Sequence, residues 1–244
     1  MITLIEELSL NALPTHQTLI YDGWIIRFAN GYGKRANSVN PIYESTRDLD
    51  EKIRFCEGLY QGKKLPLVFK LTPTVYPNDL DEKLSARGYQ IDSPTSVQIL
   101  ELTSVNSQRP QTTHLQEEFS DEWLDHYCRM NPASEPHRQT LQRILLNIVP
   151  RHCFVTLKVN DQTIACGLGV LQSEYIGLFD IVTDSAFRNH GYGQQIVNTI
   201  LTWGKQNKAK KAYLQVMLNN PSALHLYSKI GFKEKYQYWY RVKP

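Results

Sequence analysis

The sequence has few cysteines, no long apolar run and almost no excess of charge. Its four cysteines are scattered and include no Cys-x-x-Cys pair, which argues against a disulfide scaffold and against a zinc site. The N-terminus carries Glu6 and Glu7 where a signal peptide would be basic and then apolar, and no apolar run reaches membrane-spanning length. We therefore expect a cytoplasmic protein with reduced thiols, no metal and no membrane contact.

The small net charge limits which kinds of binding partner we expect. Lys and Arg number 27 against 24 Asp and Glu, a formal net charge of +3, which is too small to favour nucleic acid but suits a small anionic ligand. A hydrophobic content of 41% and a charged content of 21% are ordinary for a globular protein. The stretch 103–113 is polar, so we predict a domain at 1–102, a linker at 103–113 and a domain at 114–244.

The first domain mixes strand, helix and turn signals. Asp22-Gly23 lies between the apolar runs 19–21 and 24–28, and this dipeptide is the strongest short signal for a β-hairpin. A short helix or ordered arm is expected over 1–10. Apolar periodicity predicts further helices at 48–60 and 79–87 and further strands at 65–71 and 96–102.

The second domain alternates strands and helices in a regular order. The pattern predicts a strand, two helices, three strands, a helix, a strand, a helix and a last strand. The strands are expected at 114–119, 153–159, 163–171, 174–183, 212–217 and 232–242, and the helices at 121–130, 137–149, after residue 193 and at 222–230. Such an alternation is typical of an α/β protein.

The most informative stretch is a glycine loop between a strand and an amphipathic helix. It has the form Arg-x-x-Gly-x-Gly and consists of Arg188, Asn189, His190, Gly191, Tyr192 and Gly193. Glycines let the backbone approach a ligand closely, and a helix start offers free N–H groups and a positive dipole end. The loop therefore predicts a phosphate site, although a tight turn that caps a helix has the same letters.

A second motif lies downstream. The segment 220–232 has the form Asn-x-x-Ala-x-x-x-Tyr-x-x-x-Gly-Phe, with Asn220, Ala223, Tyr227, Gly231 and Phe232 at the fixed positions. The two motifs and the element order resemble the GNAT family of N-acetyltransferases over residues 112–244. This resemblance implies the GNAT acyl-CoA N-acyltransferase fold, an α/β fold with a mixed sheet, and acetyl-CoA as the cosubstrate.

The first domain resembles a partial copy of the second. Leu84-Ser-Ala-Arg-Gly88-Tyr89 is similar to Tyr227-Ser-Lys-Ile-Gly231-Phe232, and each lies between a buried strand and a final strand. The segment 21–41 also resembles the N-terminal region of tandem GNAT proteins related to one bacterial type of N-acetylglutamate synthase. We therefore expect a degenerate, partial GNAT-like N-terminal half; a chance similarity is the alternative, because a helix-ending glycine is common.

The resemblance also implies roles for individual residues. The edge of the strand before the loop would pair its backbone with the pantetheine arm of acetyl-CoA, and the glycine loop would hold the pyrophosphate. Tyr227 matches the general acid that protonates the departing thiolate; packing against Phe232 is its structural alternative. The implied cosubstrate-binding residues are Ile181, Val182, Thr183, Asn220 and the loop Arg188 to Gly193.

The general base is not evident from the resemblance. Many relatives place a Glu on the strand before the loop, but the matching position here is Gly177. Asp180 interrupts an apolar strand, which is costly for a buried and idle carboxylate, so we predict that it is the base or binds the substrate ammonium. A satisfied structural Asp and a water chain without a single base are the alternatives.

A basic stretch in the first domain is the candidate acceptor site. Arg27, Lys34, Arg35 and Asn37 lie close in sequence beside aromatic residues, and Arg and Lys with amides suit a substrate that carries a carboxylate. An ordinary solvated loop is the alternative.

The sequence thus predicts an N-acetyltransferase that acts by direct attack of an amine on the thioester. We expect the acceptor to be a small primary amine, for example an amino acid such as glutamate, and the protein to be a monomer or homodimer. Two alternatives stay open. The missing carboxylate at Gly177 favours a non-catalytic acyl-CoA sensor, and the acceptor could instead be an amine of a peptide or protein.

Overall fold

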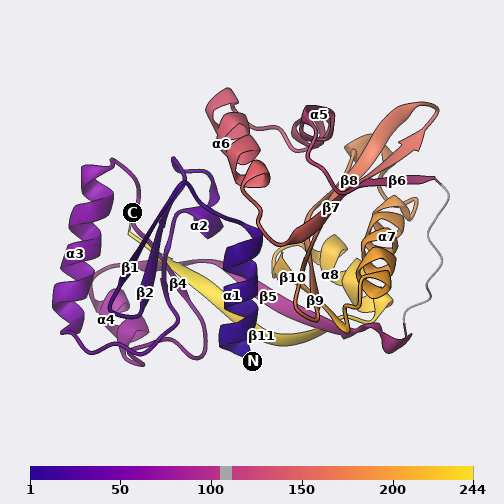
Figure 1. Cartoon of the computed structure of the whole chain (residues 1–244). Coiled ribbons are helices and arrows are strands. Elements are labelled where there is room, and N and C mark those ends of the chain that lie inside the picture. Colours follow the sequence, from indigo (N-terminus) through magenta and orange to yellow (C-terminus); the bar gives the residue numbers. More distant parts are fainter. Residues whose placement is uncertain (105–111, 244) are drawn as a thin grey trace.

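A computed structural model describes residues 1–104 and 112–243. Its strands form one sheet in the order β1-β2-β3-β4-β11-β5-β10-β9-β8-β7-β6 (Figure 1). The strands are β1 (Gln17–Tyr21), β2 (Trp24–Phe28), β3 (Val39–Pro41), β4 (Val68–Leu71), β5 (Gln90–Glu101), β6 (Thr113–Gln116), β7 (Arg151–Val159), β8 (Gln162–Gln172), β9 (Tyr175–Thr183), β10 (Lys211–Met217) and β11 (Lys233–Val242).

Helices cover both faces of this sheet. The α-helices are α1 (Ile2–Ala12), α2 (Gly33–Ala36), α3 (Leu49–Gly62), α4 (Leu80–Ala86), α5 (Asp121–Met130), α6 (Glu135–Leu146), α7 (Tyr192–Gln206) and α8 (Pro221–Ile230), and short 3-10 turns are η1 (Leu102–Ser104) and η2 (Ser185–Phe187). The predicted helices and strands are therefore present in the predicted order. The middle of the predicted linker, 105–111, lies outside the described residues.

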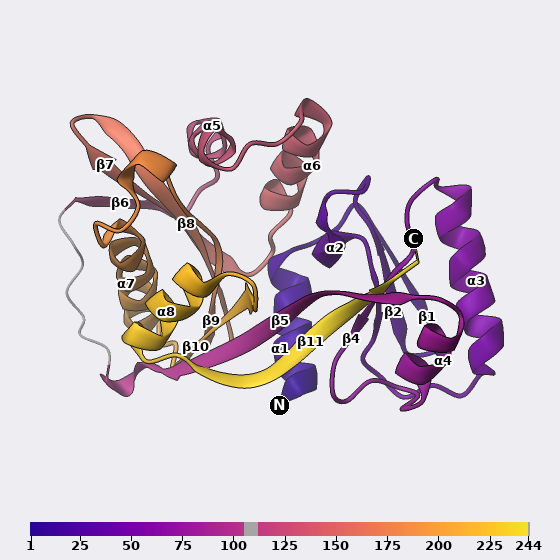
Figure 2. The same cartoon turned by 180° about the vertical axis from the view of Figure 1, so that it is seen from behind.

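The two halves of the chain exchange their last strands. β11 lies between β4 and β5, and β5 lies between β11 and β10. Both views show β5 and β11 side by side as they cross from one half of the molecule to the other (Figures 1 and 2). β5 begins at Gln90 rather than at the predicted residue 96. Its first residues pair with β11 alone and are largely exposed. That extension carries no apolar alternation in the sequence.

The sheet separates apolar clusters in the C-terminal half. One cluster packs under α7 and includes Cys153, Val155 and Ile200, whereas the other packs under α1 and α5 and includes Phe154 and Trp123. Successive residues of β7 thus point to opposite faces, as the period of a strand requires. Figure 1 shows α5 and α7 on different sides of these strands.

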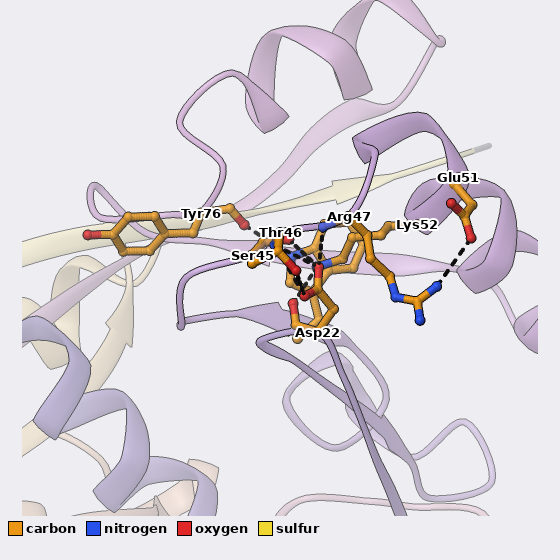
Figure 3. Close-up of polar contacts among 8 residues, drawn as sticks. Asp22, Ser45, Thr46, Arg47, Glu51, Lys52 and Tyr76 are labelled. Atoms are coloured by element: carbon orange, nitrogen blue, oxygen red, sulfur yellow. Dashed lines mark hydrogen bonds and ion pairs between the residues drawn. The ribbon is translucent and has the colours of Figure 1, made fainter.

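The β1–β2 hairpin forms at Asp22-Gly23, as predicted. Both residues have positive φ, 44° and 81°, which is the geometry of a type I′ turn. The Asp22 carboxylate accepts hydrogen bonds from the Thr46 N–H, the Arg47 N–H at 2.9 Å and the Ser45 hydroxyl at 2.8 Å (Figure 3). The Lys52 ammonium adds an ion pair at 3.0 Å. This cluster ties the hairpin to the start of α3.

Replacing Asp22 should weaken the fold in a way that depends on pH. The N–H of Arg47 and the neighbouring hydroxyls and Lys52 hold the pKa of Asp22 well below its usual range. The stabilisation is therefore present above the unfolded-state pKa of about 3.9 and is lost as the pH falls toward the folded-state pKa. We expect Asp22→Ala to lower the melting temperature at pH 7, and the deficit to shrink below about pH 4.

Thermal melts followed by circular dichroism between about pH 3 and 8 check this prediction. Glu82→Ala, at an exposed position of α4, is the matched control and should melt like the wild type. A deficit for Asp22→Ala that stays constant over the whole range would contradict the role of the charge.

Candidate active site

The site lies where β9 and β10 separate. Their parallel register runs from Tyr175 and Lys211 to Leu178 and Leu214, but β9 continues to Thr183 and β10 to Met217. The two strands therefore splay over their last residues. Backbone groups along the opening are free to bond a ligand, as they are at the edge of a sheet.

Asp180 occupies a β-bulge at the start of this opening. Gly167 of β8 faces both Asp180 and Ile181 of β9, because the register shifts between the pairs Cys166–Val182 and Leu168–Phe179. Asp180 has a φ of +50°, an unfavourable value for a non-glycine residue in a strand. A bulge of this kind redirects a side chain out of the normal alternation.

The Asp180 carboxylate is only half satisfied. Tyr127 of α5 donates a hydrogen bond to Oδ1 at 3.4 Å, and Asn131 donates to the Tyr127 hydroxyl at 2.9 Å. Oδ2 is buried and has no hydrogen-bond partner among the described residues. Burial raises the pKa of Asp180, while the Arg35 charge and the bond from Tyr127 oppose this rise. Asp180 thus has a strained backbone and a desolvated carboxylate, and its Oδ2 can accept a proton because it lacks a hydrogen-bond partner.

The glycine loop lines a groove of about 790 Å³ between β9, α7 and α8. Gly191 caps α7 with a φ of +79°, a conformation that glycine adopts without cost. Having no side chain, it leaves the first N–H groups of the helix open to a ligand. The lining residues that the sequence predicted are Ile181, Val182, Thr183, Arg188, Asn189, Gly191, Tyr192, Gly193, Asn220 and Tyr227.

His190 plays a local part in this loop. Its exposed ring packs against Tyr192 with centroids 6.0 Å apart, and its Nδ1 lies 2.8 Å from the Arg188 carbonyl. The Nε of Arg188 in turn donates a hydrogen bond to the Thr183 carbonyl at 3.4 Å. These contacts fix the shape of the loop.

A second cavity of about 500 Å³ meets the groove at the splay. Asp180 lines this cavity, together with Lys34 and Arg35 from α2. The residues that line both spaces are Ile181, Val182, Asn220, Ala223 and Tyr227. The N-terminal half therefore builds one wall of a cavity that opens onto the glycine-loop groove.

Tyr227 stands at the junction of the two spaces. It is 8% exposed, and burial raises the pKa of its phenol to about 12, so the phenol holds its proton at neutral pH. Its ring also packs edge-on against Phe232 at 5.9 Å. Asn220 caps α8 by accepting a hydrogen bond from the Ala223 N–H at 3.2 Å, so its side chain has a structural task whether or not it binds a ligand.

Arg27 and Asn37 support the loop that carries Arg35. The Arg27 guanidinium is buried and donates to the carbonyls of Arg35, Leu10 and Leu13, which joins the end of α1 to α2. Asn37 accepts from the N–H of Ala29 at 2.7 Å and holds the turn before α2. Both side chains are therefore engaged within the protein and lie outside the lining of the cavity.

Sequence reasoning missed the aromatic part of the cavity. Tyr127 comes from α5, Asn131 directly follows that helix, and Tyr238 and Tyr240 come from β11. The alternation of Tyr236, Tyr238 and Tyr240 signals one common face of a strand, but which element that face meets depends on the strand exchange.

The comparisons with known proteins agree with this geometry. Residues 1–241 match the family described as "Probable histone acetyltransferase Rv0428c C-terminal". The chain belongs to this family. It is also 28% identical to an uncharacterized N-acetyltransferase, YobR, of Bacillus subtilis over 247 residues, which covers 98% of this chain and 97% of that protein.

Solved GNAT structures share the fold. A GCN5-related N-acetyltransferase from Kribbella flavida superposes with a TM-score of 0.74 at 12% identity, covering 99% of this chain and 95% of that one. A tandem GNAT protein from the clavulanic acid biosynthesis pathway gives a TM-score of 0.59 at 11% identity, with 78% and 69% covered. The expected GNAT fold is thus confirmed, and the chain is a GNAT N-acetyltransferase, an acyltransferase.

The described residues of this GNAT chain show neither a metal-binding cluster nor a membrane-spanning helix. Among residues 1–104 and 112–243, no group of three or more His, Cys, Asp or Glu side chains could hold a metal ion. Over the same residues, no helix combines the length and the apolar character needed to cross a bilayer.

The position where many GNAT relatives carry a Glu has no room for one here. A Cβ at Gly177 would lie 2.6 Å from atoms of Phe179 and of Tyr213. The space for a side chain is therefore filled by two aromatic rings. The carboxylate in the cavity comes from the bulge at Asp180 instead.

Asp180→Asn should stabilise this GNAT protein. Because the folded state raises the pKa of Asp180, folding stability falls as the pH rises from the unfolded-state value of about 3.9 through the raised one. An amide avoids that loss and tolerates the positive φ. We expect a gain of about 0.5–2 kcal/mol at pH 7 that vanishes below about pH 4.

Chemical denaturation at several pH values measures the gain. Asp184→Asn is the matched control, and its expected change in stability is opposite. The Ala186 N–H and Arg129 lower the pKa of Asp184, so this variant should be less stable at pH 7. Equal losses of stability in both variants would show that Asp180 is an ordinary structural carboxylate.

Proposed function

We propose that this GNAT protein transfers the acetyl group of acetyl-CoA to the primary amine of a small molecule. The observation that carries the proposal is the junction of the two cavities at the splay, with Tyr227 between them and Asp180 on the far side. A donor in the glycine-loop groove and an amine in the second cavity would meet there. The sensor alternative loses its support, because a carboxylate reaches the cavity despite Gly177.

The residues present fit acetyl-CoA. The open helix start at Gly191 and the loop from Arg188 suit a pyrophosphate, and the unpaired edge of β9 at Ile181 and Val182 suits an amide-bearing arm. Acetyl-CoA, when bound, would supply an activated acetyl thioester. Asn220 and Tyr227 line both spaces and would flank that thioester.

Two side chains can carry out the proton transfers of this reaction. The acceptor ammonium must lose two protons to become an amide. Asp180 would take a proton from the nitrogen through its partnerless Oδ2 and release it to solvent. Tyr227 would give its phenolic proton to the departing sulfur and would be reprotonated by the second proton that the nitrogen loses. The C–N bond forms as the C–S bond breaks, one proton ends on the thiol and one in solvent.

An amino acid is the acceptor class that we propose. The cavity of about 500 Å³ has the size of a small-molecule site, and Arg35 on its wall offers a partner for a carboxylate. The matching family description speaks of a histone acetyltransferase, so a lysine side chain is the competing acceptor. Release of CoA thiol with a panel of amino acids and lysine peptides decides between them, and an inert protein would contradict both.

The free thiols agree with a reducing compartment. Cys56, Cys128 and Cys166 form no disulfide, and the thiols of Cys56 and Cys166 are buried. The cytoplasm is therefore the compartment that we propose.

Tyr227→Phe should lower turnover and spare donor binding. Loss of a general acid typically costs a factor of about 10²–10⁴, whereas the phenol ring that packs on Phe232 is kept. We expect kcat to fall about a hundredfold or more and the Kd for CoA, measured by calorimetry, to stay unchanged. Tyr43→Phe, remote from both cavities, is the control; an unaltered kcat for Tyr227→Phe removes the residue from the mechanism.

Gly191→Ala should weaken donor binding. A φ of +79° costs an L-residue about 1–2 kcal/mol, so the loop would populate its binding shape less and the Kd for CoA should rise about tenfold. Gly58→Ala, in α3 with open space around its Cβ, should leave the Kd unchanged. Equal affinities in the wild type and Gly191→Ala would show that the loop does not contact the donor.

A further inference from the structure

Few charged side chains line the acceptor cavity. Among the described residues of its wall they are Lys34, Arg35 and Asp180. The Lys34 ammonium is already engaged, because its Nζ lies 2.7 Å from Asp92 Oδ1 and 3.0 Å from the Ser93 hydroxyl. One cation and one anion thus remain for a ligand.

Arg35 is held in place without an ion pair to any described carboxylate. Arg27 donates to the Arg35 backbone carbonyl at 2.8 Å, which fixes the residue on α2. The guanidinium lies 6.0 Å from the centroid of the Phe179 ring, one residue before Asp180. Within the part of the chain that the structure describes, no carboxylate forms an ion pair with it. A guanidinium carries five N–H donors, and their best match is a carboxylate bound through both oxygens.

Asp180 supplies the opposite charge. Its Oδ2 is buried without a partner, and an ammonium group is the ligand that satisfies such an oxygen best. Arg35 and Asp180 influence each other electrostatically but form no ion pair within 4 Å among the described residues. A molecule with an ammonium and a carboxylate on the same carbon atom would bridge them.

Neutral side chains form the rest of the wall. The polar ones are Ser93, Thr95, Asn131, Gln215 and Asn220. Rings and aliphatic chains come from all the surrounding elements: Leu13, Tyr32, Phe179, Met217, Tyr238 and Tyr240. Such a wall favours an uncharged side chain. A second carboxylate would be desolvated there with only the engaged Lys34 nearby, which is costly.

We propose that the acceptor is an α-amino acid with an uncharged side chain. Arg35 binds its carboxylate, Asp180 binds its ammonium, and the tyrosine-lined wall receives its side chain. This specificity disfavours glutamate, which the sequence allowed. The inference rests on the proposed acetyl transfer at the same site, because the ammonium held at Asp180 is the group to be acetylated.

The test compares amino acids with their decarboxylated amines. Thiol release from acetyl-CoA is measured with phenylalanine against 2-phenylethylamine, with leucine against isopentylamine, and with glutamate. The wild type should prefer each amino acid over its amine by about a hundredfold in kcat/KM and should use leucine and phenylalanine better than glutamate. Arg35→Met should reduce the preference to near one, because KM for the amino acid rises in a way that the amine does not share.

Control variants separate binding from folding. Arg54→Met makes the same change at an exposed position of α3 and should keep the hundredfold preference. Arg35→Lys retains the charge but loses the fork of donors and should give an intermediate preference. Circular dichroism shows whether each variant is folded, and the 2-phenylethylamine rate shows whether its chemistry is intact.

The outcomes are distinct. A wild type that releases thiol with both members of each pair at equal rates overturns the inference but leaves the acetyl transfer standing. The same follows if glutamate is the best amino acid, or if Arg35→Met loses activity on both members equally. A wild type that releases no thiol with any amine overturns the proposed function itself.

Discussion

The exchange of β5 and β11 is the constraint on which the rest of the molecule depends. β11 is hydrogen-bonded to β4 on one side and β5 on the other, and β5 is bonded to β10. Neither half can close its sheet without a strand of the other. The exchange sets α2 of the first half against β9 of the second, so that Arg35 and Phe179 meet. It also places Tyr238 and Tyr240 in the wall of a cavity whose carboxylate is far away in sequence.

The two halves repeat one order of elements but treat their anion sites differently. In each, a strand, a helix and a parallel strand are followed by a helix and the exchanged strand: β3, α3, β4, α4, β5 and β9, α7, β10, α8, β11. The start of α7 is open at Gly191. The segment before α3 instead surrounds the Asp22 carboxylate, which accepts hydrogen bonds from the Thr46 and Arg47 N–H groups. An internal carboxylate thus occupies the backbone donors before α3, whereas the start of α7 lines the glycine-loop groove.

Local signals predicted much of this structure. The turn at Asp22-Gly23 and the loop that ends at Gly193 depend on neighbouring residues, so the sequence shows them directly. The strand exchange could not be predicted, because a strand's period of two says which residues share a face but not which strand pairs beside it. The bulge at Asp180 is likewise set by register with β8, where a Cβ at Gly167 would clash with Ile181. Tyr127 and Arg35 therefore reach the site through long-range packing that no local pattern encodes.

Buried charges in this protein fall into two kinds, and the difference separates structure from function. Glu6 and Lys70 form a buried ion pair, and the Tyr236 hydroxyl donates to the same carboxylate at 2.6 Å. Such a group has its partners within the fold, and their attraction and hydrogen bonds offset part of its desolvation cost. Asp180 breaks several local rules together, with a positive φ, a desolvated charge and an oxygen left without a partner. Unfavourable features of this kind persist where the surrounding structure maintains them and a ligand uses them. Arg35 lines the same cavity and forms no ion pair with a described carboxylate. The ligand that we propose for this cavity therefore carries a positive and a negative group at once.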